Sequence, residues 1–157
     1  MAISGRPCRA TEVSEDVDAQ VVEDCRREDV RSLRRIVDGC AVLAGLDEEA
    51  RDVVVLLTSE VVTNAVVHGG PPARMAVRAT HRHVHVEVAD AAPGVPVVRA
   101  PDEARAHGRG MALVDDLASA WGVVAGTGAG HPEGKTVWFH VARAGAGCSG
   151  GHGTTPR

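Results

Sequence analysis

Aromatic side chains are scarce in this chain, whose 157 residues include no Tyr, one Phe and two Trp. Positive charge is not in excess either, because the formal net charge is -4 at pH 7. Nucleic-acid binding needs a basic surface for the phosphates, and single strands are usually bound by stacking the bases on aromatic rings. The composition therefore argues against direct binding of nucleic acid.

Long apolar segments and zinc-type cysteine motifs are also missing. No run of 18 or more apolar residues is present, and acidic residues occupy the N-terminal part, where a signal peptide would be apolar. We therefore expect a soluble, cytoplasmic protein without a membrane segment. The cysteines contain no C-x-x-C pair, which indicates free thiols rather than a zinc site. They are Cys8, Cys25, Cys40 and Cys148.

The length fits a single domain with loose ends. Residues 1–18 are polar and lack periodicity, so we expect a flexible N-terminal arm, followed by a short edge strand at 19–22. Residues 144–157 are rich in Gly and cannot bury apolar surface, which predicts a disordered tail. The domain itself is expected over residues 19–143.

Helical periodicity follows the arm. Apolar residues recur every three or four positions over 28–44, as in an amphipathic helix, and Gly45 is placed to end it. Asp47 is a predicted N-cap for a second helix, which has two glutamates in its first turn and stops at Gly69.

The second helix contains the sequence TSEVVTNAVVHGG at residues 58–70, which places Glu60, Asn64 and His68 at successive i, i+4 steps. These three residues share one side of the helix. The same rotation sets four aliphatic residues within about 60° of Glu60. They are Val53, Leu56, Leu57 and Val67. A carboxylate in such surroundings needs a partner, a metal or a raised pKa, whereas the simpler interpretation is a glutamate at the wet edge of the helix.

After this helix, apolar residues recur at every second position. Residues 73–80 and 83–90 alternate and predict a β-hairpin. In the second strand, valines should face one side of the sheet and polar residues the other. His83 and His85 belong to the polar side, and with His81 they form a candidate metal site. A solvated strand face has the same pattern and is the favoured interpretation.

A loop rich in Pro follows Asp90 and predicts a lid or a linker. It leads to Gly108 and Gly110 at the start of a third helix, where phosphate oxygens can approach free backbone N–H groups. A second hairpin is expected from 121–125 and 135–141. These elements predict a two-layer α/β sandwich, with about three helices on one face of a mixed, mostly antiparallel sheet.

Four motifs follow one another along the chain, and they are SEVVTNAVVHG, VADAAPG, HGRGMALV and GKTVWF. In this order they resemble the GHKL ATP-binding domain of histidine kinases, Hsp90 and DNA gyrase, which has the Bergerat-type fold. The resemblance covers about residues 28–142 and is closest to small stand-alone serine kinases of the anti-sigma-factor type. A sensor histidine kinase would need an upstream helical hairpin, which is not expected in the short N-terminal arm.

The resemblance implies a role for each matching residue. Asp90 would accept the adenine amino group, with support from Thr136. Asn64 would bind Mg²⁺ and Glu60 would be the catalytic residue, while His68 would only support or cap the helix. The implied nucleotide-binding residues are Asn64, Asp90, Gly94, Arg105, Gly108, Arg109, Gly110, Met111 and Thr136.

The implied cofactors are ATP and Mg²⁺. The implied activity is transfer of the ATP γ-phosphate to Ser or Thr of an antagonist (anti-anti-sigma) protein, together with binding of a sigma factor, and the resemblance suggests a homodimer. One departure is that Ala92 stands where the family has a glycine, followed by the stiff Pro93. The departure supports an alternative, a protein-interaction module of the same fold that binds ATP weakly or without catalysis.

Overall fold

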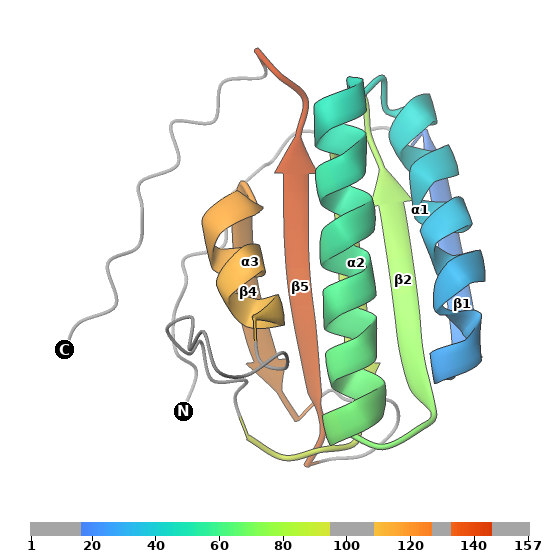
Figure 1. The fold of residues 1–157 in the computed structure, drawn as a ribbon, viewed down its shortest axis with the longest axis vertical. Coiled ribbons are helices and arrows are strands. Elements are labelled where there is room, and N and C mark those ends of the chain that lie inside the picture. Colours follow the sequence, from blue (N-terminus) through green and yellow to red (C-terminus); the bar gives the residue numbers. More distant parts are fainter. Residues whose placement is uncertain (1–16, 95–108, 127–132, 146–157) are drawn as a thin grey trace, which may run out of the picture.

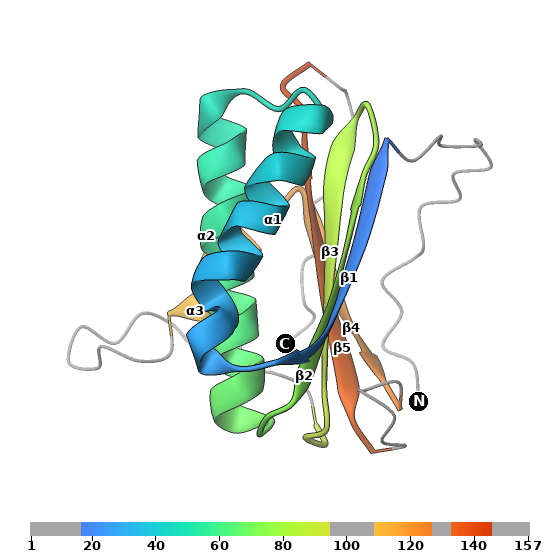
Figure 2. The same cartoon turned by 90° about the vertical axis from the view of Figure 1, so that its right-hand side faces the viewer.

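The computed structural model describes residues 17–94, 109–126 and 133–145. Within these residues, three α-helices cover one face of a five-stranded sheet, and no described helix lies on the other face (Figures 1 and 2). The predicted two-layer sandwich is confirmed. In chain order the elements are β1 (Asp18–Cys25), the 3-10 helix η1 (Arg27–Asp29), α1 (Val30–Leu43), α2 (Glu48–His68), β2 (Ala73–Ala79), β3 (His83–Asp90), α3 (Gly110–Leu117), β4 (Ala120–Ala125) and β5 (Lys135–Ala142).

The strand order in the sheet is β1-β2-β3-β5-β4. All four neighbouring pairs are antiparallel, so the described sheet has no mixed part. The predicted edge strand is β1, which is longer than the expected 19–22 and has a register shift between Val22 and Cys25. Strands β3 and β5 lie in the middle, and their ends carry the residues discussed below.

Local signals set the helix ends. The Asp47 side chain accepts a hydrogen bond from the Ala50 backbone N–H at 2.9 Å, which confirms the predicted N-cap of α2. Gly45 has a φ of 70°, the left-handed conformation that ends many helices and that glycine adopts without strain.

The core lies between α2 and the central strands. Helix α2 turns Leu57, Val61 and Ala65 toward the sheet, and each is at most 3% exposed. Strand β3 contributes three buried valines at alternate positions to the same core, while its polar residues face the other side as predicted. Apolar burial of this kind contributes about 25 cal/mol per Å² and is the main force that fixes α2 over the sheet.

Some expected features lie outside the described residues. They include nearly all of the N-terminal arm, the loop beyond Gly94, the C-terminal tail, and the candidate site residues Arg105 and Gly108.

Candidate functional site

Helix α2 carries Glu60 to the start of α3. Glu60 and Asn64 are both half-buried, one helical turn apart. A Cβ atom added at Gly110, the first residue of α3, would lie 2.9 Å from Glu60 Oε2 and 3.2 Å from Glu60 Cβ. The structure therefore brings the predicted catalytic carboxylate against the glycine that opens α3.

The expected aliphatic surroundings of Glu60 are only partly present. Leu57 is buried, but Leu56 is 39% exposed and Val67 is 52% exposed. Helix α2 packs on the sheet through a neighbouring face, which includes the fully buried Thr58, so these two residues point away from the core. Glu60 therefore lies at the border of the packed face, where a charged carboxylate remains accessible to a ligand.

Asp90 ends β3 in the interior of the protein and is 1% exposed. Its Oδ1 accepts a hydrogen bond from the Ala92 backbone N–H at 2.8 Å. The end of α2 packs directly on this carboxyl group, because a Cβ atom at Gly69 would lie 2.5 Å from Asp90 Cγ and 2.5 Å from the Ala65 carbonyl oxygen. Only glycine fits at position 69 without displacing Asp90.

The partner of Asp90 is Lys135, which the sequence analysis missed. Lys135 Nζ lies 2.8 Å from Asp90 Oδ1 and 3.4 Å from the Ala92 carbonyl oxygen. The Lys135 and Asp90 side chains are 7% and 2% exposed, respectively. A charge this deeply buried is stable only when it is paired.

The predicted support of Asp90 by Thr136 is replaced by this contact. Thr136 pairs with Ala89 and Lys135 pairs with Asp90. Because successive side chains of a strand point to opposite faces, Thr136 lies on the face away from the Asp90 carboxylate. The sequence did contain a signal for Lys135, since the apolar residues at 137, 139 and 141 place position 135 on the buried face.

The loop after Asp90 begins with the altered glycine box. Ala91 and Ala92 are half-buried, and Pro93 and Gly94 are exposed. Gly94 has a φ of 93°, which favours glycine at this predicted site position. The backbone N–H and carbonyl oxygen of Ala92 both have partners in the Asp90 and Lys135 cluster.

The remaining described residues of the predicted phosphate-binding part of the site lie at the start of α3. Arg109 is the exposed N-cap residue of α3 and Gly110 begins the helix. Met111 is 5% exposed and packs in the core, so its role is to anchor the helix. The unpaired N–H groups and the dipole of a helix start favour negative charge, and an exposed guanidinium adds to this preference.

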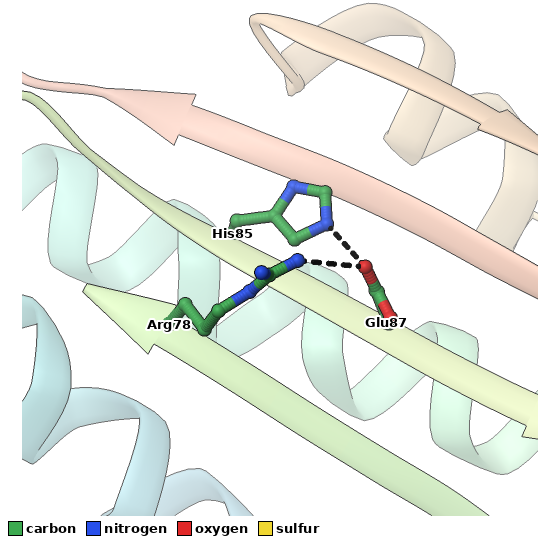
Figure 3. A network of polar contacts seen from close by, with 3 residues as sticks. All are labelled: Arg78, His85 and Glu87. Carbon is green, nitrogen blue, oxygen red and sulfur yellow. Dashed lines mark hydrogen bonds and ion pairs between the residues drawn. The ribbon is translucent and has the colours of Figure 1, made fainter. Parts of the chain in front are cut away.

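Histidines gather on the opposite face of the sheet. His85 Nε2 lies 2.9 Å from Glu87 Oε1, and Arg78 Nη2 lies 3.2 Å from the same oxygen (Figure 3). The His85 hydrogen bond is the largest cause that lowers the pKa of Glu87. Burial, together with the charges of His83 and His85, lowers the pKa of His140 to about 4.

These histidines give the metal hypothesis no support. Within the described part of the chain, no group of three or more His, Cys, Asp or Glu residues is placed to hold a metal ion. His81 is exposed in the turn between β2 and β3, while His83 and His85 are partly covered by neighbouring rings. The alternating pattern places His83 and His85 on the face of the sheet that the helices do not cover.

Comparison with protein-family models matches residues 25–141 to the family described as "Histidine kinase-like ATPase domain". The chain belongs to this family. ATP binding is therefore the activity that membership assigns to it. No curated protein matches the chain. No helix among the described residues is long and apolar enough to cross a membrane.

The residues present fit a nucleotide with a divalent cation. Asp90 is a buried carboxylate, chemically able to accept a hydrogen bond from a base amino group, and Gly69 lets the end of α2 pack directly on it. Asn64 offers a neutral carbonyl oxygen, a ligand suited to Mg²⁺, which usually binds through phosphates and few protein groups.

Proposed function

We propose that this protein transfers the ATP γ-phosphate to a Ser or Thr hydroxyl of an antagonist protein, and in another state binds a sigma factor. The observation that supports the proposal best is the contact between Glu60 and Gly110, with Asn64 one turn along α2. It brings together a carboxylate, which can serve as a base, and a helix start, which can stabilise phosphate charge.

In this reaction Glu60 accepts the proton of the attacking hydroxyl. The hydroxyl oxygen forms a bond to the γ-phosphorus while the bond to the bridging oxygen breaks, so ADP leaves with that electron pair. The N–H groups at the start of α3 and the Arg109 guanidinium stabilise the phosphate charge. Asn64 would hold Mg²⁺, which neutralises phosphate charge when bound.

Substitution of Glu60 tests this assignment. Glu60→Gln keeps the shape and removes the base, so we expect transfer of radiolabelled phosphate to the antagonist to fall at least about 100-fold, with the Kd for ATP changed less than about threefold. Glu49→Gln is the matched control, because Glu49 is an exposed carboxylate in the first turn of the same helix. Loss of ATP binding in Glu60→Gln would assign Glu60 a structural role, and unchanged transfer would end its assignment as base.

A non-catalytic interaction module is the second candidate. Ala92 and Pro93 favour it, since they replace part of the flexible glycine box. Incubation with Mg²⁺, ATP and a panel of antagonist proteins separates the two functions. Phosphate on a Ser or Thr of an antagonist supports the kinase, whereas ATP-dependent capture without phosphate transfer supports the module.

The proposed partners are a sigma factor and its antagonist. We propose that a homodimer of this chain binds them in the cytoplasm. A pull-down from the native host, repeated with ATP and with ADP, tests these partners. Recovery of a sigma factor in one nucleotide state and of a small antagonist in the other is the expected result. Sedimentation of the purified chain at micromolar concentration tests the dimer.

A further inference from the structure

Lys135 is the only lysine among the chain's 17 lysine and arginine residues. It is 6% exposed and lies against the carboxylate proposed to bind the base. Lysine differs from arginine in having a compact charge with three rotatable donors rather than a planar fork. Beside Asp90 there is therefore a buried donor that can divide its N–H groups between neighbours.

The ammonium group has three N–H donors. Among the described residues, it contacts Asp90 Oδ1 at 2.8 Å and the Ala92 carbonyl oxygen at 3.4 Å. Asp90 Oδ1 also accepts the Ala92 N–H, which leaves Oδ2 as the less occupied oxygen. Asp90 and Lys135 thus form an acceptor and a donor side by side at the ends of β3 and β5.

We propose that Lys135 is a specificity-determining residue, which donates a hydrogen bond to ring nitrogen N1 of adenine while Asp90 accepts from the 6-amino group. Adenine has this donor and acceptor as neighbours on one edge. Guanine has a carbonyl oxygen and an N–H at the same positions, so both contacts would be reversed and its buried groups left unpaired. The inference rests on the proposed binding of the base at Asp90.

Calorimetry of the full chain with three nucleotides tests the proposed contacts of Asp90 and Lys135 with the base. The nucleotides are ATP, 1-deaza-ATP, which lacks the N1 acceptor, and purine riboside triphosphate, which lacks the 6-amino group. The wild type should bind each analogue about tenfold or more weakly than ATP, because each leaves one charged group of the site unmatched. Lys135→Met should bind ATP and 1-deaza-ATP within about twofold of each other and still discriminate against purine riboside triphosphate.

Arg143→Met is the matched control, because Arg143 is an exposed cation just beyond the other end of β5. It should keep the wild-type order of affinities. Equal wild-type affinity for ATP and 1-deaza-ATP would overturn the inference, and so would full discrimination in Lys135→Met. Asp90→Ala isolates the earlier step, since unchanged ATP affinity in that variant would refute the base site itself.

A second measurement uses the folded wild type, in case Lys135→Met leaves Asp90 unpaired and does not fold. Selective ¹⁵N labelling of lysine gives one side-chain signal, because the chain has one lysine. ATP should shift the Nζ resonance strongly, and 1-deaza-ATP should shift it only weakly. Equal shifts with both nucleotides would show that Lys135 does not contact N1.

Discussion

Polar side chains are buried on one face of the sheet and partly exposed on the other. On the face covered by the helices, Asp90 and Lys135 are almost fully buried and pair with each other in close contact with α2. On the open face, Arg78, His85 and Glu87 form a network in which Arg78 is 53% exposed and Glu87 is 36% exposed (Figure 3).

The two faces differ in the free energy that is needed to place a charge on them. A charge on the covered face loses its hydration and is stable only with a well-placed partner, so a pair there has a strong effect on its neighbours. A charge on the open face keeps much of its water, so the same kind of contact contributes little. The covered pair is therefore the candidate for a function, whereas the open network contributes little to stability.

Among the substitutions that test this comparison, Gly69→Ala should have the largest effect on stability. The added Cβ would lie 2.5 Å from both Asp90 Cγ and the Ala65 carbonyl oxygen, so α2 or β3 must move. We expect a loss of about 1–3 kcal/mol in the free energy of unfolding, as for other overpacked sites, and a weaker affinity for ATP. Urea titration and calorimetry measure the two quantities.

Gly110→Ala is the control for crowding at the site. Its Cβ would lie 2.9 Å from Glu60 Oε2, the end of a flexible side chain that can rotate away, and 3.2 Å from Glu60 Cβ, a contact that a small shift can relieve. Stability should change by less than about 1 kcal/mol, because alanine also favours the helix. Equal destabilisation at positions 69 and 110 would contradict the view that Asp90 is fixed and Glu60 is adjustable.

His140 should make the open face sensitive to acid. Its pKa is lowered from 6.5 to about 4 in the folded state, chiefly by burial. Between these values the unfolded chain binds a proton that the folded protein does not, so stability should fall as the pH decreases from about 6.5 to about 4. Urea midpoints at pH 7.5 and pH 5 should differ less in His140→Gln than in the wild type. The same loss in both proteins would assign the acid sensitivity to other groups.

Glu87→Gln should have the smallest effect. It removes the ion pair with Arg78 and weakens the contact with His85, but exposed pairs contribute only about 0–1 kcal/mol. The free energy of unfolding at pH 7.5 should change by no more than about 1 kcal/mol, as measured by urea titration. A loss as large as that of Gly69→Ala would show that the open face is structurally as demanding as the covered one.

Most of the fold followed from local sequence patterns. The N-cap at Asp47, the left-handed Gly45 and the period-two valines of β3 act within a few residues, so they predict element bounds directly. The order of the five described strands and their antiparallel pairing depend on contacts between distant segments, and periodicity does not contain that information.

The site was predicted less completely because its decisive contacts are long-range. The approach of Gly69 to Asp90 and the pairing of Lys135 with Asp90 depend on where a helix ends and on the register of β3 with β5. A shift of one residue in a strand moves a side chain to the other face, and the register places Lys135 beside the Asp90 carboxylate, whereas the resemblance implied Thr136. Glu60 and Asn64, which share one helix, needed only helical geometry.

The two tryptophans give each face of the sheet its own optical reporter. Trp138 lies on the open face over Gly122, where an added Cβ would be 2.8 Å from the indole ring, and stacks with His85. Trp121 packs against the core, and its indole N–H bonds to Asp115 of α3 at 2.9 Å. Because the chain has no other tryptophan and no tyrosine, Trp138→Phe would leave only the fluorescence of Trp121, which reports on the contact between β4 and α3. Movement of that helix could then be timed in solution without attaching a dye.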